Sequence, residues 1–387
     1  MNKTIQHSTQ HSTKSDRIAW VDALKIAACL LVVIAHCSDP FTGAFDSDRI
    51  SFITGVAVGS LTRPSVPLFV MMTAILLLPA QSGSSLGSFY RRRIGRIMPA
   101  LIFWSVILPV AFYLYFGNAN TANPTVDAAS YTWSGLWHKI CLMTVNFNFD
   151  TVPLWYLYML VGLYLIIPII SPWLEKASRS DVRLLLLIWG FTLFIPYIRL
   201  LAPAVGYTGN FGSMEIFGAC DWNAYGTFYY VSGFVGYMLL AYYIRRWPLQ
   251  WSAAKTAAIC VPMFIAGYCI TFFGYLKLQE LYPGDYSYLE IIYYFTGINV
   301  FMMTFPILVA FSRLRIRQRP WLGKLASLTF GIYLCHFFFV FVAYDIFDIK
   351  GVAPIVRLML MAATSIVVSG ALTWVMRQWR PTRRLVA

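Results

Sequence analysis

Long apolar segments recur along this chain and constrain its fold more than any other feature. The hydrocarbon core of a bilayer is about 30 Å thick, so a helix that rises about 1.5 Å per residue crosses it in about 20 residues. Ten segments are suited to such a crossing. They are residues 18–37, 62–80, 97–117, 153–172, 183–199, 227–244, 256–274, 289–311, 325–344 and 353–376. The sequence therefore predicts an all-α, polytopic membrane protein with about ten transmembrane helices.

Positive charge is distributed unevenly among the connections between these predicted helices. Most of the 30 Lys and Arg residues fall in alternate connections, whereas most of the 16 acidic residues fall in the others. Connections rich in Lys and Arg stay on the cytosolic side of a membrane. Both ends are therefore predicted to be cytosolic, and topology explains the net charge of +14 without a nucleic-acid partner. The basic sequences are RRRIGR, EKASRSDVR, IRRW, SRLRIRQRP and RQWRPTRR.

Three parts of the chain differ in composition. Residues 1–17 are polar, repeat the sequence QHST and lack the apolar core of a signal peptide, so we expect a disordered cytosolic tail. Residues 18–376 are predicted to form a single membrane domain, and residues 377–387 a short basic cytosolic tail. The seven cysteines lie mostly in apolar segments without the spacing of disulfide or zinc motifs, so no metal site is predicted.

The first predicted helix carries ionisable residues, which are costly inside a bilayer and therefore mark functional sites. Lys25 and His36 are eleven residues apart, so on an α-helix they share a face and lie about 16 Å apart along its axis. Asp22 lies near the same face and can pair with Lys25. We predict a catalytic role for His36, with packing as the alternative, and expect any acid that orients it to come from another segment.

Four arginines occur within six residues just before the third predicted span, in FYRRRIGRIMP at residues 89–99. Arg93 and Arg96 are three residues apart, so on a helix both guanidinium groups reach one site. Guanidinium groups match phosphate oxygens in geometry. Membrane anchoring explains one or two arginines, but four favour an anionic ligand, with Arg92, Arg93 and Arg96 as its predicted contacts. Pro99 is expected in the first turn of the next helix.

These motifs, in this order, resemble the acyltransferase-3 family of integral membrane acyltransferases. That family has a basic residue ten positions ahead of a histidine on its first span, an Arg-x-x-Arg element, and a late Ser-Leu-x-x-Tyr-x-x-His segment. The first position is more often Arg, whereas Lys25 keeps the charge without the fork of donors. The matching segments are KIAACLLVVIAH from Lys25, RPSVPLFVMMTAILL from Arg63, RRIGRIMP from Arg92, LWYLYMLVGLYLIIPII from Leu154 and SLTFGIYLCHFFF from Ser327.

The resemblance implies an O-acetyltransferase of a bacterial inner membrane. Its acyl donor would be cytosolic acetyl-CoA, with no permanently bound cofactor, and its acceptor a hydroxyl of a cell-surface polysaccharide or a polyprenyl-linked precursor. A pantetheine arm of about 15–20 Å would reach from Arg93 and Arg96 to His36. His36 would act as general base, with an acyl-histidine as the variant. Lys25 would bind the donor or stabilise charge, held in place by Asp22.

Five further residues are candidates for the acceptor side. Arg63 is expected at the outer start of the second span, where it would bind an oxyanion or acceptor phosphate, or extend to the membrane interface. His336 and Tyr333 share a face of a late span, in a direct or a packing role. Trp155 and Tyr156 would stack on sugar or form part of an interfacial aromatic belt.

Two other classes of function fit a polytopic membrane protein. A transporter of a lipid-linked saccharide also needs a polar cavity, but it does not need a cluster of arginines one pantetheine length from a histidine. A structural partner in an envelope-assembly complex leaves the polar face of the first helix unexplained. Turnover of a labelled thioester by the purified protein separates the enzyme from both.

Overall fold

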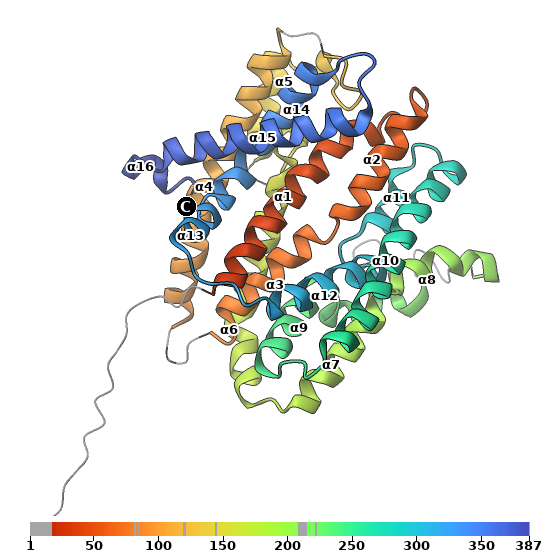
Figure 1. The fold of residues 1–387 in the computed structure, drawn as a ribbon, viewed down its shortest axis with the longest axis vertical. Coiled ribbons are helices and arrows are strands. Elements are labelled where there is room, and N and C mark those ends of the chain that lie inside the picture. Colours follow the sequence, from red (N-terminus) through yellow and green to blue (C-terminus); the bar gives the residue numbers. More distant parts are fainter. Residues whose placement is uncertain are drawn as a thin grey trace, which may run out of the picture.

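A computed structural model describes residues 18–80, 83, 85–118, 121–143, 145–207, 215–220 and 223–386 (Figure 1). The predicted tail at residues 1–17 lies outside this range. The described residues form helices and no β-strand apart from one isolated bridge between Cys220 and Asn223. The α-helices are α1 (Ala19–Thr42), α2 (Arg49–Thr62), α3 (Ser65–Leu77), α4 (Leu86–Phe116), α5 (Trp133–Leu142), α6 (Trp155–Lys176), α7 (Arg179–Thr192), α8 (Ile195–Leu201), α9 (Phe234–Arg246), α10 (Ala253–Leu281), α11 (Tyr286–Tyr293), α12 (Ile298–Arg313), α13 (Pro320–Ala326), α14 (Thr329–Phe347), α15 (Pro354–Met376) and α16 (Arg380–Arg383).

Short 3₁₀ helices complete the described secondary structure: η1 (Ala128–Ser130), η2 (Phe149–Leu154), η3 (Ala202–Val205), η4 (Ile216–Gly218) and η5 (Gly226–Val231). Within the described residues, nine helical segments are long and apolar enough to cross a membrane, which confirms the predicted all-α, polytopic membrane fold. They are Ala19–Thr42, Arg49–Leu77, Leu86–Phe116, Phe149–Lys176, Arg179–Val205, Ala253–Leu281, Tyr288–Arg313, Thr329–Phe347 and Pro354–Met376.

The expected span at residues 227–244 is not one continuous helix. It divides into η5 and α9 at Gly233, whose positive φ of 74° breaks the helical path. The α9 helix has 13 residues, too few to cross a bilayer alone, and most of its side chains are buried in the bundle. The apolar composition of this segment therefore reflects burial in protein.

The second expected span, residues 62–80, begins too late. Helix α2 already starts at Arg49, where Asp48 accepts hydrogen bonds from the backbone N–H groups of Ile50 and Ser51. Pro64, which has no N–H to donate, marks the break between α2 and α3. Arg63 consequently lies at this break inside the span Arg49–Leu77 and not at its outer start.

Two glycines allow α1 and α2 to pack closely. A Cβ at Gly55 would come within 2.8 Å of backbone atoms of Phe41 and Thr42, and one at Gly59 would lie 3.0 Å from Ser38 Oγ and Tyr293 Oη. Small residues four positions apart let membrane helices approach in this way. The close packing brings the C-terminal half of α1 next to Tyr293 and the break at Arg63.

The arginine-rich segment is helical, as its predicted role requires. Ser85 caps α4 by accepting a hydrogen bond from Ser88 N, and the helix continues from Leu86 to Phe116. The predicted span at residues 97–117 therefore covers only its apolar part. Pro99 lies inside α4 and not in its first turn, contrary to expectation.

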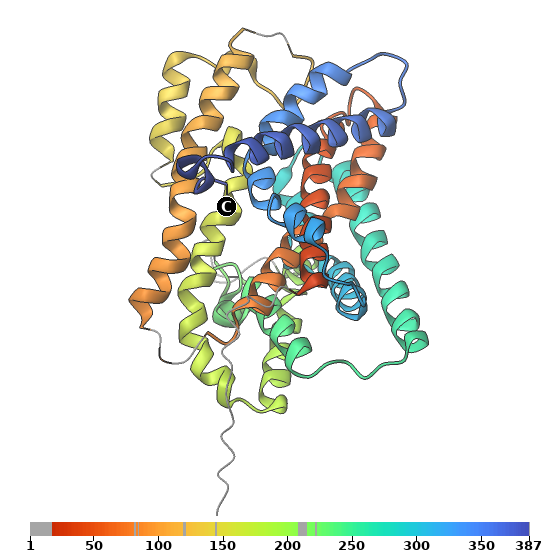
Figure 2. The same cartoon turned by 60° about the vertical axis from the view of Figure 1, so that its left-hand side comes forward.

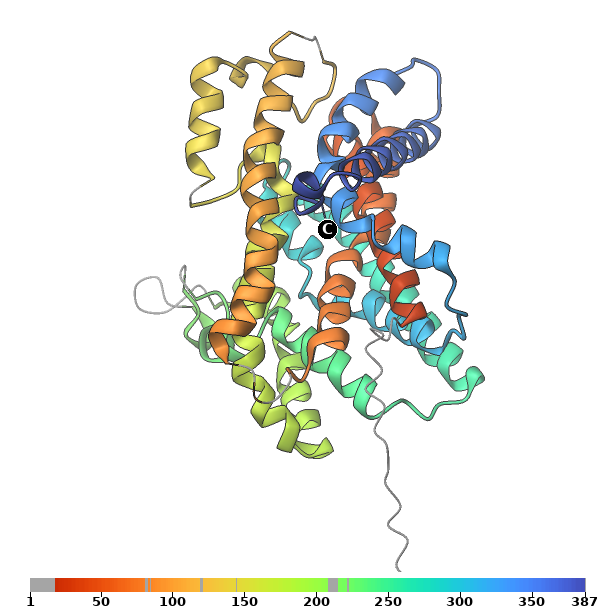
Figure 3. The same cartoon turned by 90° about the vertical axis from the view of Figure 1, so that its left-hand side faces the viewer.

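The basic segment that follows α15 is packed against the bundle. Trp104 of α4 donates a hydrogen bond from Nε1 to the carbonyl oxygen of Leu385 at 3.0 Å, and Val386 is fully buried in the main hydrophobic core. Figures 2 and 3 show α16 beside α4 from two directions. The predicted basic tail thus has a fixed place next to the arginines of α4.

Candidate functional site

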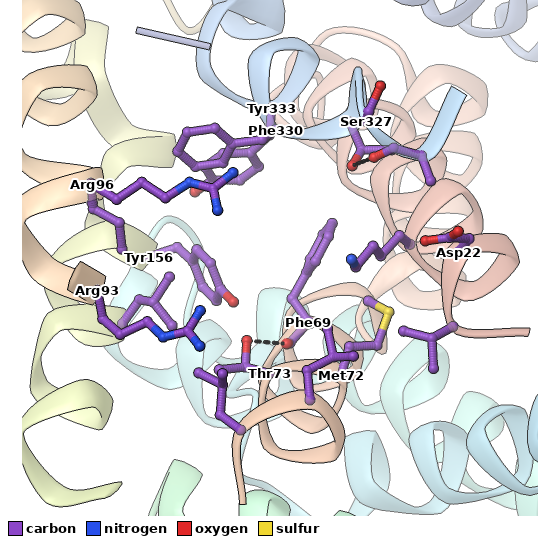
Figure 4. Close-up of a pocket in the computed structure, with 18 of the residues that line it drawn as sticks. Asp22, Phe69, Met72, Thr73, Arg93, Arg96, Tyr156, Ser327, Phe330 and Tyr333 are labelled. Atoms are coloured by element: carbon purple, nitrogen blue, oxygen red, sulfur yellow. Dashed lines mark hydrogen bonds between the residues drawn. The ribbon is translucent and has the colours of Figure 1, made fainter. Parts of the chain in front are cut away.

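A cavity of about 690 Å³ opens between α1, α3, α4, α6 and α14 (Figure 4). It gathers six residues that the sequence analysis singled out: Asp22, Lys25, Arg93, Arg96, Tyr156 and Tyr333. Its described lining also includes Phe69, Met72, Thr73, Tyr164, Ser327, Phe330, Arg377 and Arg383. Segments far apart in the sequence therefore contribute to one site.

The cavity is strongly basic. Arg93 and Arg96 extend their guanidinium groups from α4 into it and face Asp22 on the opposite wall (Figure 4). Lys25, Arg377 and Arg383 add three more cations, and Asp22 is the one acidic side chain among the described lining residues. Gln318 Nε2 donates to Asp22 Oδ2 at 3.5 Å. A concave site with this charge attracts a ligand with several negative charges.

Arg377 and Arg383 were missed as site residues in the sequence analysis. They lie more than 280 positions after Arg93 and Arg96, and their segment was assigned to membrane topology alone. In the structure Arg377 donates a hydrogen bond to the carbonyl oxygen of Ser327, which fixes the start of the basic segment at the cavity wall. Lys25 near the start of the described chain and Arg377 and Arg383 near its end thus line one cavity. This is expected if both ends of the chain lie on the same side of the membrane.

Arg92 points elsewhere. It lines a neighbouring pocket of about 480 Å³, together with Arg91, Gly95, Arg96, Pro99, Arg383 and Arg384. Arg96 and Arg383 line both spaces, so the pocket adjoins the main cavity. The three arginines predicted to bind one ligand therefore divide between two adjacent sites.

The rings of Phe69, Tyr156 and Tyr333 form an aromatic layer in the wall of the cavity. Tyr333 lies 5.7 Å from Tyr156 and 6.3 Å from Phe69, measured between ring centroids, and Tyr156 lies 5.9 Å from Phe69. The Tyr333 hydroxyl donates a hydrogen bond to the carbonyl oxygen of Pro153. Tyr156 is nearly buried and faces this cavity, so an outer aromatic belt does not account for it. His36 is absent from the described lining and lies beyond this aromatic layer.

His36 carries its own acidic partner. Its Nδ1 lies 2.9 Å from Oδ2 of Asp39, one turn further along α1. The expectation that an orienting acid comes from another segment is therefore wrong, because α1 continues through Pro40 to Thr42, past the predicted end at residue 37. A carboxylate at Nδ1 holds the proton there and leaves Nε2 with its lone pair, which is the tautomer that a general base needs.

His336 lies beside His36 with a ring-centroid distance of 5.3 Å. It is fully buried, and its Nδ1 lies 2.7 Å from the carbonyl oxygen of Tyr333. Because a carbonyl only accepts, Nδ1 is the donor, and Nε2 remains an acceptor that has no partner within the described part of the chain. The Tyr333 ring lies 6.0 Å from that of His336, so Tyr333, His336 and His36 form a continuous row from the cavity to the catalytic candidate.

Arg63 and Trp155 meet at one aromatic patch. The Arg63 guanidinium carbon lies 4.0 Å from the Tyr293 ring centroid and 5.8 Å from that of Phe295, and Trp155 stacks on Phe295 at 5.4 Å. Arg63 Nε donates to the carbonyl oxygen of Gly59 at 3.2 Å. These contacts hold both side chains within the bundle, and neither is among the described lining residues of the arginine cavity.

The fold and the site together define a polytopic membrane protein with a basic ligand cavity on one side of an aromatic layer and a histidine–aspartate pair on the other. The family model of the acyltransferase-3 acyltransferase domain matches residues 18–374, so the chain belongs to that family. No curated protein and no solved structure matches the chain. It is accordingly a membrane acyltransferase, with a bilayer, an acyl donor and an acceptor as its partners.

Proposed function

We propose that this protein is an O-acetyltransferase that transfers the acetyl group of acetyl-CoA to a hydroxyl of a surface polysaccharide or its lipid-linked precursor in a bacterial inner membrane. The observation that carries the proposal is the basic cavity, which ends two ring contacts away from the histidine–aspartate pair. Within the family, the segment GTFYYVSGFVGYML at residues 226–239 resembles the enterobacterial common antigen O-acetyltransferase, and this favours a glycan acceptor.

The cavity suits a thioester of coenzyme A. Five cations, contributed by Lys25, Arg93, Arg96, Arg377 and Arg383, would hold the phosphates of the nucleotide. Phe69, Tyr156 and Tyr333 also line the cavity, and an uncharged pantetheine arm would lie against their rings. Asp22 would limit the mobility of Lys25. Movement of the Tyr333 ring would admit the acetyl group to His36.

His36 would act as the base in a direct transfer. Its Nε2 would take the proton of the acceptor hydroxyl as that oxygen forms a bond to the thioester carbonyl carbon. The carbon–sulfur bond then breaks, and the coenzyme thiolate leaves and takes up a proton. Asp39 would stabilise the imidazolium that forms between these steps. In the acyl-histidine variant, Nε2 itself attacks the carbonyl carbon, the carbon–sulfur bond breaks and the coenzyme thiolate leaves. The acceptor hydroxyl then attacks the acetyl group on Nε2, loses its proton and releases the neutral histidine.

The acceptor would approach from the side that bears Asp39. This carboxylate is 42% exposed, whereas the His36 side chain is 19% exposed, so a hydroxyl could reach the pair from there. Arg63 would stabilise the oxyanion or bind an acceptor phosphate, and the His336 ring would pack against His36 and support its position. Trp155 would support the patch on which Arg63 lies.

The test is acetyl transfer by purified protein supplied with radiolabelled acetyl-CoA and a membrane extract that contains the host glycan precursors. We expect His36→Ala to lower the transfer rate at least a hundredfold at unchanged protein abundance, since general-base catalysis contributes about 10² to 10⁴. The control is His138→Ala, an exposed position on α5. Full activity of His36→Ala would refute the mechanism. Saccharide movement across vesicles without consumption of acetyl-CoA would instead establish a transporter.

A further inference from the structure

The pocket beside the main cavity is lined by five arginines: Arg91, Arg92, Arg96, Arg383 and Arg384. The only other described lining residues are Gly95 and Pro99, so no acidic side chain is among them. The membrane-topology explanation requires positive charge on this side of the bilayer, but it does not require the cations to converge on one concavity.

Convergence of these arginines is unfavourable unless an anion is present. Like charges gathered in one concavity repel each other, and near a protein surface they do so more strongly than in bulk water. The arrangement is nevertheless held by the fold. The hydrogen bond from Trp104 to Leu385 and the burial of Val386 dock the segment that carries Arg383 and Arg384 against α4. Two distant parts of the chain are therefore packed so that their guanidinium groups share a pocket.

The pocket also adjoins the proposed donor site. Arg96 and Arg383 line both the pocket and the main cavity, so two anionic groups bound in the two spaces would be neighbours. A ligand with a diphosphate and a separate phosphate monoester fits this division. The monoester carries about two negative charges at neutral pH and offers three oxygens to guanidinium donors.

We infer that the arginine pocket binds the phosphate monoester on the ribose of the donor coenzyme, while its diphosphate lies in the main cavity. This inference rests on the proposed function and adds to it a basis for donor selection: the enzyme would discriminate a coenzyme A thioester from the same thioester that lacks the ribose phosphate. The docked segment at residues 377–386 would then be part of the donor site, with Arg384 and Arg91 specific to the monoester.

The experiment compares acetyl-CoA with acetyl-dephospho-CoA, both as substrates and, in direct binding measurements, as ligands of the purified protein in phosphatidylcholine nanodiscs. The variants are Arg384→Gln and Arg91→Gln, alone and combined, which keep much of each side chain and remove its charge. The control is Arg183→Gln, an exposed arginine on α7. Detergent melting curves establish that every variant is folded.

We expect the wild-type protein and the control to bind acetyl-CoA about tenfold to a hundredfold more tightly than acetyl-dephospho-CoA, as hydrogen bonds to a charged group predict. The combined variant should lose this preference and bind acetyl-dephospho-CoA as the wild type does. Equal binding of the two thioesters by the wild type would overturn the inference. Discrimination in binding without any acetyl transfer would retain the pocket assignment and refute the proposed function.

An anionic lipid headgroup carries the same phosphate chemistry, and the nanodiscs distinguish it. Suppose that phosphatidylglycerol stimulates acetyl transfer by the wild type but not by the combined variant, and that this variant keeps the preference for acetyl-CoA. The pocket then binds lipid, and the inference is wrong. If the combined variant instead loses the preference for acetyl-CoA to the same extent in phosphatidylcholine alone and with added phosphatidylglycerol, the pocket binds the coenzyme.

Discussion

His36 owes its proposed reactivity to a residue on its own helix. The 2.9 Å contact between His36 Nδ1 and Asp39 Oδ2 fixes the ring and its tautomer, while Phe337 packs edge-on against the same ring at 5.0 Å. The imidazole is thus held from two sides, and its Nε2 is the atom left to act. Such positioning of a base by a carboxylate supports catalysis without transfer of the proton to the acid.

Asp39→Asn tests this role. An asparagine amide can donate to Nδ1, which would place the imidazole proton on Nε2 and block its action as a base. We expect kcat to fall at least tenfold, with an unchanged KM for acetyl-CoA because the donor cavity does not include Asp39. Steady-state kinetics measure both, with the exposed Asp46→Asn as control. A raised KM at constant kcat would contradict an orienting role.

The sequence predicted some of these residues because helical spacing is local information. Lys25 and His36 could be placed on one face, and Arg93 with Arg96, without knowledge of any other element. Asp39 was missed because the predicted span stopped at residue 37, although the helix continues to Thr42. The contact between His36 and His336 joins positions 300 residues apart, and no spacing rule within one helix contains it.

Among the elements, the connection between α4 and α6 depends on one buried ion pair. Lys139 of α5 lies 2.9 Å from Asp150 of η2, whose side chain is fully buried, and Tyr131 Oη donates to Asp150 Oδ1 at 2.8 Å. Burial, followed by the charge of Asp150, raises the pKa of Tyr131, so the phenol stays protonated and remains a donor. The contacts of Lys139 and Tyr131 with Asp150 hold η2 in place. The Pro153 carbonyl oxygen of η2 accepts the hydrogen bond from Tyr333.

Lys139→Met should therefore destabilise the protein. It leaves a buried carboxylate without its cation, a change that costs about 3–5 kcal/mol, whereas removal of both charges is far less harmful. We expect a lower unfolding temperature for Lys139→Met in detergent and a partial recovery in the double variant with Asp150→Asn. If the double variant melted no higher than the single one, the pair would not hold this connection.

Helical segments were predictable where hydropathy alone marked them. They were not predictable where arginines, glycines or hydroxyl side chains lowered the hydropathy of part of a helix. The apolar core of α4 was found, but its start at Leu86 was missed because the arginine-rich turns look like a loop on hydropathy alone. The break at Arg63 required knowing that α2 begins at Arg49, in a segment whose glycines and hydroxyls lower its mean hydropathy. Those glycines serve close helix packing, which composition does not reveal.

On the scale of the whole molecule, the two chemical halves lie on opposite sides of an aromatic layer. The arginines of α4 and of residues 377–386 line the cavity on one side, while His36 and Asp39 lie on the other, two ring contacts beyond Tyr333. Charge distribution predicted the overall membrane topology, since the positive-inside rule needs only the order of the segments. Docking of the basic segment on α4 was not predictable, because it depends on single contacts such as Trp104 with Leu385.

This division predicts that donor and acceptor are used from opposite faces of the membrane. Cys141 on α5 is the exposed cysteine among the described residues, so its labelling by an impermeant maleimide reports the orientation of the protein in sealed vesicles. In vesicles that expose Cys141 outside, we expect acetyl-CoA to support transfer only when it is trapped inside. Permeabilisation should restore activity with external acetyl-CoA, and Cys141→Ser should abolish labelling without loss of activity. Efficient use of external acetyl-CoA by intact vesicles of this orientation would contradict a donor cavity on the opposite side.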